Sequence, residues 1–267
     1  MLSCVNSRMS DILKGKKILV TRPVHQANRL CSMIEQAGGV PIRLPAIDIQ
    51  PIVDRGRIDI VLSRLDKYAI AIFVSRNAVF YAMPLLGDRK SALAALQIIA
   101  LGQGTAAALS AAGLPSAIHG GAQADSEALL DLPVLQEAAV RKQRIVIFRG
   151  TGGRELLADT LRARGAEVDY AEVYQRRKPH YDKSLLDKIW CTEKPDQLVV
   201  TSSEALHNLF TMLGPGHRGI MLDTPMVVIG ARMAEQAREL GFKRQPAIAD
   251  ATSDEGLLRA ILQNIAV

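Results

Sequence analysis

The strongest constraint on the fold is an internal repeat, because one order of segments occurs twice along the 267 residues. The segment ILVTRPVHQANRLCSMIEQAGG, from position 18, aligns with IVIFRGTGGRELLADTLRARGA, from position 145. Farther along, Ser75 of FVSRNAV aligns with Ser202 of VVTSSEAL, and Gly102 of IALGQG aligns with Gly230 of VVIGAR. The offset is 127 or 128 residues in each block. The chain is therefore predicted to contain two copies of one fold.

Each repeated block reads as a strand, a turn and a helix. A short apolar, β-branched run is followed by a small or polar turn and then by a segment with helical periodicity. Glycines at 38, 113, 165 and 241 mark helix ends. Because the strands are apolar on both faces, they belong in parallel sheets covered by helices on both sides. The predicted fold class is α/β, with two similar lobes, each a parallel sheet of about four or five strands flanked by helices.

Two stretches break this rhythm, PIRLPAIDIQPI (41–52) and AEVYQRRKP (171–179). Both combine alternating residues with proline, so they are predicted to be extended connectors that pass from one lobe to the other. A cleft between two such lobes is a common place for a ligand. Near the N-terminus, the residues before Met9 are expected to be a frayed tail, or Met9 is expected to be the initiator.

Composition narrows the functional class. The chain is 48% hydrophobic but has no apolar run long enough to span a bilayer and no signal-peptide pattern, so a soluble cytoplasmic protein is expected. Its three cysteines are scattered, with no C-x-x-C spacing and no nearby histidine, so neither a disulfide framework nor a zinc site is predicted. The net charge of +6 fits an anionic small molecule, or solubility alone. With 4% aromatic residues, base stacking on nucleic acid has little support.

The glycine-rich turn after the strand at 145–149 does not match a nucleotide-binding motif. A dinucleotide fingerprint starting at Gly150 requires a third glycine where this chain has Glu155, and the G-K-[ST] of a P-loop is absent. The turn still places backbone N–H groups at the start of a helix, which favours an anion. The alternative is that its glycines only permit a tight turn.

Small polar residues and arginines recur at the predicted strand ends. In parallel α/β sheets, ligands bind beyond the carboxyl ends of the strands, and guanidinium groups with backbone N–H groups suit carboxylates. For a single Ser or Thr, helix N-capping is the alternative role. No hydrolytic or metal motif is present, and the histidines are dispersed. The candidate binding residues are Thr21, Arg22, Ser75, Arg76, Asn77, Gly102, Thr105, Arg149, Gly150, Thr201, Ser202, Ser203, Gly230 and Arg232.

The ordered set of segments resembles the uroporphyrinogen-III synthase family. VTRPVHQANRL, FVSRNAV, IALGQGTAAAL, GGRELLADTLRARGAEVDYAEVYQR, VVTSSEAL and SDEGLL carry the resemblance, which extends from about Lys16 to the end. It implies a lyase of haem biosynthesis that closes hydroxymethylbilane, a linear tetrapyrrole with eight carboxylates, to uroporphyrinogen III. Ring D is inverted through a spiro-pyrrolenine intermediate. The resemblance also implies a monomer that uses no metal or organic cofactor, and the composition predicts that it binds neither nucleic acid nor membrane.

The resemblance further implies that the two lobes are segment-swapped. Residues 1–40 and 180–267 would form one lobe and 50–170 the other, with 41–49 and 171–179 as paired connectors that form a hinge. The swap is not visible in the repeat itself.

Tyr174 is the candidate catalytic residue. It lies in the second connector, where a phenol can donate a hydrogen bond without ionising, and it matches the family's cleft tyrosine. It is therefore the candidate general acid for the departure of the substrate's hydroxyl; the alternative is a tyrosine that only packs in the connector. The family commonly has threonine where this chain has Val74, and another after Gly230, where this chain has Ala231-Arg232-Met233. Two alternatives remain open: a two-lobed anion-binding or sensor protein, and a nucleotide-dependent transferase.

Overall fold

The chain divides into two compact units. The computed structural model describes residues 12–114, 117–121 and 125–265. Unit 1 combines Met1–Asp48 with Arg177–Val267, and unit 2 is Ile49–Arg176. Cys4 and the tail expected before Met9 lie outside the described residues. Within the described part, no helix is both long enough and apolar enough to cross a bilayer.

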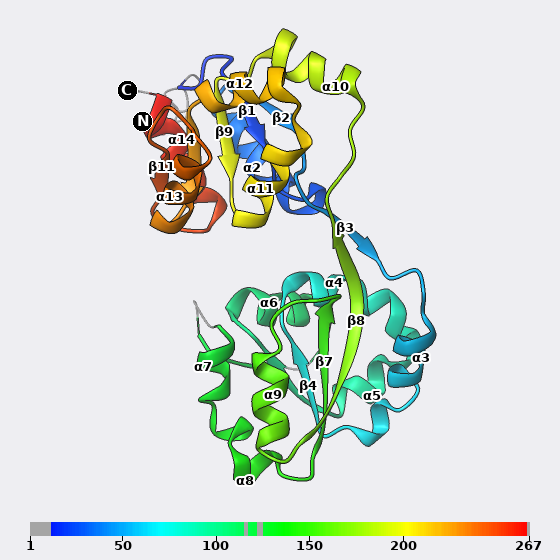
Figure 1. Cartoon of the computed structure of the whole chain (residues 1–267). Coiled ribbons are helices and arrows are strands. Elements are labelled where there is room, and N and C mark those ends of the chain that lie inside the picture. The colour runs from blue at the N-terminus through cyan, green and yellow to red at the C-terminus, as the bar shows by residue number, and fades with distance from the viewer. Residues whose placement is uncertain (1–11, 115–116, 122–124, 266–267) are drawn as a thin grey trace, which may run out of the picture. The chain divides into compact units, whose positions relative to one another are not determined.

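Unit 1 contains a five-stranded sheet in the order β11-β10-β9-β1-β2, and all four pairings are parallel. The strands are β1 (Lys17–Val20), β2 (Val40–Arg43), β9 (Gln197–Val200), β10 (Met226–Ile229) and β11 (Ala247–Ala249). The helices are α2 (Val24–Gln36), α10 (Lys183–Asp187), η4 (Lys188–Glu193), α11 (Ser203–Met212), α12 (Pro215–Asp223), α13 (Ala231–Glu239) and α14 (Asp254–Ile265) (Figure 1).

Both faces of the unit 1 sheet are buried. Ile18 and Val20 of β1 pack in one cluster with Leu30 and Ile34 of α2 and with Leu257 of α14. The intervening side chain of β1 points to the opposite face, as alternation in a strand requires, and it is also buried. This explains why the strands of this unit read as continuous apolar runs.

Unit 2 contains a six-stranded sheet in the order β3-β8-β7-β4-β5-β6. The pairs β8·β7, β7·β4, β4·β5 and β5·β6 are parallel. The strands are β3 (Asp48–Pro51), β4 (Ile70–Phe73), β5 (Gln97–Ala100), β6 (Ile118–His119), β7 (Arg144–Gly150) and β8 (Glu167–Arg177). The helices are α3 (Gly56–Leu62), η1 (Leu65–Lys67), α4 (Arg76–Leu86), η2 (Gly87–Arg89), α5 (Lys90–Ala94), α6 (Gln103–Ala111), α7 (Ser126–Leu130), η3 (Pro133–Leu135), α8 (Glu137–Val140) and α9 (Leu156–Ala163).

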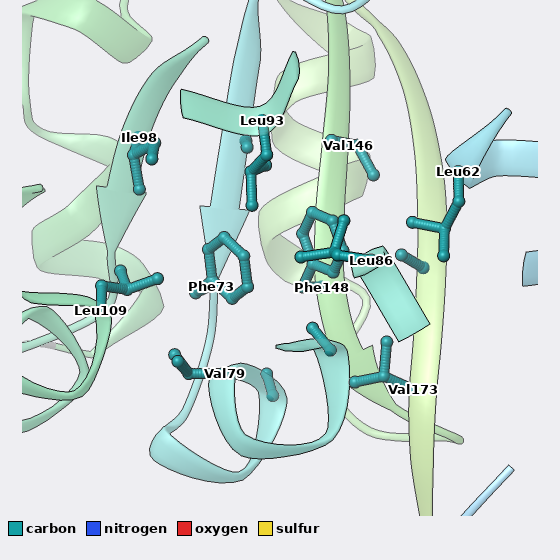
Figure 2. Packing of buried hydrophobic residues seen from close by; sticks show 14 of the residues in the cluster. Leu62, Phe73, Val79, Leu86, Leu93, Ile98, Leu109, Val146, Phe148 and Val173 are labelled. Carbon is teal, nitrogen blue, oxygen red and sulfur yellow. The ribbon is translucent and has the colours of Figure 1, made fainter. Parts of the chain in front are cut away.

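The unit 2 sheet separates two apolar layers. On one face, Phe73 of β4 stacks on Phe148 of β7 with ring centroids 4.3 Å apart, and helices α3, α4, α5 and α6 cover them (Figure 2). On the other face, Ile72 and Ile147 pack against α7, α8 and α9. Each buried aliphatic or aromatic side chain of this kind contributes about 1.5–3 kcal/mol to folding. The layers hold the strand ends, and thus the turns that follow them, in fixed positions.

The two sheets have the same order of equivalent strands, and the halves of the chain are exchanged between them. β1 and β2 of the first half pair with β9, β10 and β11 of the second half. Conversely, β4, β5 and β6 of the first half pair with β7 and β8 of the second. The predicted α/β fold, with two similar parallel sheets and a segment swap, is confirmed.

The segments expected as connectors are strands over much of their length. The first, expected at 41–49, supplies most of β2 and the start of β3, and the second, expected at 171–179, continues β8 as far as Arg177. Two of the prolines that suggested extended connectors, Pro41 and Pro51, lie in β2 and β3, which are edge strands. An edge strand tolerates proline because one side of it forms no ladder hydrogen bonds. The expected cleft and hinge stay predictions.

Candidate functional site

Tyr174 lies on β8 at the carboxyl edge of the unit 2 sheet, where a β-bulge sets its direction. The regular pairing of β7 with β8 ends at Arg149, and after a register shift Gly150 lies opposite Tyr174. Val173 and Tyr174 are both buried and belong to the same core cluster. In a regular strand, adjacent side chains point to opposite faces. The bulge therefore turns Tyr174 toward the side of the sheet that α4 covers, a use of bulges that is frequent near active sites.

The Tyr174 hydroxyl has two polar neighbours. It lies 3.2 Å from the Ser75 Oγ, and the Arg176 Nη2 donates to the phenol oxygen at 3.4 Å. Ser75 also caps α4, because its Oγ accepts a hydrogen bond from the Ala78 N–H at 3.0 Å. Since Arg176 donates to the phenol oxygen, the phenol hydrogen remains available for donation to Ser75 or to a ligand.

The aromatic ring of Tyr174 is held by a close approach of the backbone. The ring is 1% exposed and lies 5.7 Å from the Tyr81 ring, centroid to centroid. A Cβ added at Gly150 would come within 2.5 Å of the Tyr174 Cε2. Any side chain at position 150 would therefore push the ring away, so Gly150 contributes to this site by packing.

The Arg149 side chain is held by contacts within the glycine-rich turn. Its guanidinium donates to the carbonyl oxygens of Gly150 and Gly152, at 3.2 and 2.5 Å, and pairs with Glu155 at 3.0 Å. It also lies over the Tyr170 ring, 4.5 Å from the centroid. The hydrogen bond from Tyr170 lowers the pKa of Glu155 most, with Arg149 adding to the effect, so Glu155 remains an anionic partner. The turn thus holds an internal arginine, with Tyr174 packed against its first glycine.

The remaining unit 2 candidates lie at the starts of α4 and α6. Arg76 is exposed and forms no ion pair with the described residues. A Cβ at Gly104 would lie 3.7 Å from the Arg76 Cδ, so the arginine extends over the first turn of α6. Gly102 begins this helix without a side-chain cap, whereas Asn77 and Thr105 are buried. The Arg76 side chain thus lies beside the uncapped start of α6.

In unit 1, the turn after β1 is held by internal contacts, as is the equivalent turn after β7 in unit 2. Thr21 is fully buried and donates through its Oγ1 to the Val199 carbonyl at 2.9 Å. Arg22, the equivalent of Arg149, is 8% exposed and pairs with Asp254 at the start of α14. In both copies, this arginine is thus buried and ion-paired.

The other unit 1 candidates follow β9 and β10. Ser202 caps α11 by accepting from the Ala205 N–H at 3.1 Å. Ser203 donates to the Gln236 Oε1 at 2.6 Å, beside a hollow of about 190 Å³ between α11 and α13. Thr201 is partly exposed immediately before the cap. Gly230 starts α13 with φ +80° and without a side-chain cap, and Arg232 is exposed with no ion-pair partner in the described chain.

The sequence analysis missed two neighbours of Tyr174. Arg176 lies two residues along the same strand, a spacing that could have identified it because residues i and i+2 share a face. Tyr81 lies on α4, and its hydroxyl donates to the Ile49 carbonyl at 2.5 Å. No sequence signal links Tyr81 to Tyr174, because their contact depends on how α4 packs on the sheet.

The sequence shows no histidine close to a cysteine, but the fold brings one of each together. Cys191, Asp187 and His217 bring one ligand atom each within 4.8 Å of one another. The sequence hides this cluster because His217 comes from a separate helix.

Comparisons with known proteins agree on one family. The family model for uroporphyrinogen-III synthase HemD matches residues 28–259. The uroporphyrinogen-III synthases of Escherichia coli K12 and Salmonella typhimurium LT2 are each 35% identical over 246 and 252 residues, covering 91% of this chain and 99% of each relative.

Solved structures share the fold. A mutant uroporphyrinogen III synthase of Thermus thermophilus has a TM-score of 0.60 at 18% identity, and the uroporphyrinogen-III synthetase of Helicobacter pylori 26695 has 0.60 at 17%. These matches cover 94% and 93% of this chain and 99% of each solved chain. With the family model matching most of the sequence, the chain belongs to the uroporphyrinogen-III synthase family.

Proposed function

We propose that this protein closes hydroxymethylbilane to uroporphyrinogen III with inversion of ring D, as an enzyme of haem biosynthesis. The match to two uroporphyrinogen-III synthases over 99% of their length carries this proposal. No described feature favours the anion-sensor or nucleotide-transferase alternatives over it.

The cationic groups of each unit suit a substrate with eight carboxylates. Arg76 in unit 2 and Arg232 in unit 1 are exposed arginines without ion-pair partners in the described chain. Arg232 lies in the first turn of α13, and Arg76, the first residue of α4, extends over the first turn of α6. Neither α6 nor α13 has a side-chain cap. Helix N-termini and guanidinium groups both favour carboxylates. We assign these two arginines to substrate binding, and we assign Arg22 and Arg149 to holding their turns.

Tyr174 is the proposed general acid. In this step the C–O bond of the substrate's hydroxymethyl group breaks, the phenol proton goes to the departing oxygen, and water leaves. A proton returns when the ring closes and the product becomes aromatic again. The Arg176 guanidinium, 3.4 Å from the phenol oxygen, favours the negative charge that forms on it. Because Tyr174 is 1% exposed, substrate must displace a covering group, and the exposed Arg176 side chain is the candidate.

The proposal also includes a cytoplasmic monomer. Cys31 and Cys191 are free thiols, as expected in a reducing compartment. Sedimentation analysis at micromolar concentration tests the monomer, and a concentration-dependent increase in mass would contradict it.

The central experiment incubates the full chain with freshly prepared hydroxymethylbilane, followed by oxidation and separation of the uroporphyrin isomers. The expected product is isomer III. Isomer I alone, the product of closure without inversion, would overturn the proposed function.

Two tyrosine variants test the role of Tyr174. Tyr174→Phe is expected to lower kcat about 10²-fold, at the low end for a general acid. Tyr68→Phe is the matched control, because Tyr68 packs in the same core as Tyr174. Tyr68 precedes the amino end of β4, whereas the candidate site follows the carboxyl ends of the strands, and its hydroxyl donates to Asp169. Full activity of Tyr174→Phe would remove Tyr174 from the mechanism without contradicting the overall reaction.

A further inference from the structure

Unit 1 contains a cluster of three potential metal ligands that the proposed function does not use. The atoms are a carboxylate oxygen of Asp187, the Sγ of Cys191 and a ring nitrogen of His217. We propose that these three residues bind a transition-metal cation of the Zn²⁺ type, with a fourth coordination position left to water.

Local helix geometry places two of the ligands on one face. α10 ends at Asp187 and continues directly into η4, a π-helix over Lys188–Glu193. Lys183, Asp187 and Cys191 therefore follow one another at four-residue steps along a continuous helical segment, a spacing that brings side chains together. π-helical turns are rare and occur frequently at functional sites.

The third ligand comes from α12, which packs against η4. The His217 Nε2 lies 2.7 Å from the Asp187 Oδ1, and the other carboxylate oxygen accepts from the Lys183 ammonium at 2.7 Å. The carboxylate is thus already oriented toward the imidazole.

The distances are compatible with tetrahedral coordination after small side-chain movements. With Zn–N and Zn–O bonds near 2.05 Å and a Zn–S bond near 2.3 Å, ligand atoms are about 3.3–3.6 Å apart. The three ligand atoms lie within 4.8 Å of one another, so no pair has to close by more than roughly 1.5 Å to reach this spacing. Cys191 is exposed, and the Asp187 and Lys183 side chains are 40% and 84% exposed, so rotamer changes can achieve this.

The donor set selects the class of cation. One sulfur, one imidazole nitrogen and one carboxylate oxygen suit Zn²⁺, Co²⁺ or Ni²⁺, whereas Mg²⁺ and Ca²⁺ prefer oxygen ligands alone. Binding would release the thiol proton of Cys191 and replace the hydrogen shared by Asp187 and His217.

The expected consequence is stabilisation of unit 1. A bound cation would link α12 to the α10–η4 segment. That segment ends beside the start of the first strand, because the Lys17 ammonium donates to the Glu193 carbonyl at 2.7 Å. The cluster therefore precedes the amino ends of the strands, whereas the candidate substrate residues follow their carboxyl ends. Activity is not required to detect the site.

Cobalt titration of the full chain under reducing conditions tests the proposal directly. Co²⁺ is expected to produce a thiolate-to-metal absorption band in the near ultraviolet and visible bands typical of tetrahedral geometry, at one ion per chain. Zn²⁺ should remove these bands by displacing Co²⁺, and it should raise the Tm of the protein.

Three variants define the ligands. Cys191→Ser is expected to abolish the near-ultraviolet band, and His217→Ala to weaken Co²⁺ binding at least tenfold. Cys4→Ser is the matched thiol control and should retain both the band and the affinity. Absence of the band in the unmodified protein, its persistence in Cys191→Ser, or unchanged affinity in His217→Ala would each overturn the three-ligand site.

Discussion

Replacing Gly150 by alanine tests how the fold positions Tyr174. The added methyl would lie 2.5 Å from the Tyr174 Cε2 and 2.6 Å from its Cζ, whereas ordinary contacts begin near 3.4 Å. Gly150 does not have a positive φ, so the backbone can accept alanine and the effect comes from the steric contact. The ring or its strand must therefore move by roughly 1 Å.

The structure sets the expected size of the loss in stability and of the loss in rate. The ring is buried against Tyr81, so it cannot move into solvent, and overpacking of this kind costs about 1–3 kcal/mol of unfolding free energy. A 1 Å displacement would also break the 3.2 Å contact between the Tyr174 hydroxyl and Ser75. Misplacement of that size can cost about 10²-fold in rate. The loss in kcat should not exceed that of Tyr174→Phe, because the phenol is the only group whose chemical role changes.

The assay combines urea unfolding with initial rates of uroporphyrinogen III formation, in four proteins: the unmodified chain, Gly150→Ala, Tyr174→Phe and the double variant. Phenylalanine keeps the ring atoms that alanine would meet, so Gly150→Ala should cost the same stability in both backgrounds. It should lower kcat only where the phenol is present. Gly39→Ala is the control, because its Cβ would lie 2.8 Å from Leu13 in unit 1 and should destabilise without lowering kcat.

Two results would refute this reasoning. Equal kcat losses from Gly150→Ala in the tyrosine and phenylalanine backgrounds would show that the glycine acts on activity independently of the phenol. A Gly150→Ala variant with unchanged stability and unchanged kcat would show that the strand yields without moving the ring.

Three further predictions concern charge and capping. Burial, the largest influence, raises the pKa of Asp196, but hydrogen bonds from the Lys17 N–H and the Lys16 ammonium outweigh it and leave the pKa below 3.8. Asp196→Asn should therefore lower the free energy of unfolding by about 1 kcal/mol at neutral pH. In urea titrations, the difference in unfolding free energy between the variant and the unmodified protein should shrink as the pH falls below about 4, where Asp196 becomes protonated. Arg76→Gln and Arg232→Gln should each raise KM about fivefold with little change in kcat, most clearly at low salt, and an unchanged KM would remove that arginine from the site. Ser75→Ala and Ser202→Ala should each lower the free energy of unfolding by about 1 kcal/mol, because each removes a helix cap. Only Ser75→Ala should lower kcat; equal kcat values in the two variants would show that Ser75 does not act on Tyr174.

The fold was largely predictable because its signals are local and repeated. Gly38, Gly113, Gly165 and Gly241, which the sequence marks as helix ends, all have positive φ. The apolar strands are buried on both faces, as their continuous hydrophobic runs indicate. The swap required the family resemblance, because a repeat alone leaves open which half pairs with which.

The site was less predictable because it depends on contacts distant in sequence. Arg149 beside a glycine-rich turn predicts an anion ligand, yet the folded turn supplies carbonyl oxygens and Glu155 to the same guanidinium. The bulge that directs Tyr174 has no sequence marker, because it arises from a register shift between paired strands. A buried arginine needs such partners, whereas an exposed one such as Arg76 can bind a ligand.

Comparison of the two repeats supports a division of roles between the units. At the repeat offset, Arg22 corresponds to Arg149 and Ser202 to Ser75, so both copies retain the buried arginine and the helix cap. At the same offset, Gly150 corresponds to proline and Tyr174 to a buried isoleucine. The isoleucine has no proton to donate, and proline excludes the backbone approach that Gly150 permits. The retained arginine and cap hold equivalent turns in both units, but of the two equivalent positions only the one in unit 2 carries a proton donor. With Arg76 and Arg232 proposed as the groups that bind substrate carboxylates, we expect substitutions in unit 1 to change KM and those around Tyr174 to change kcat.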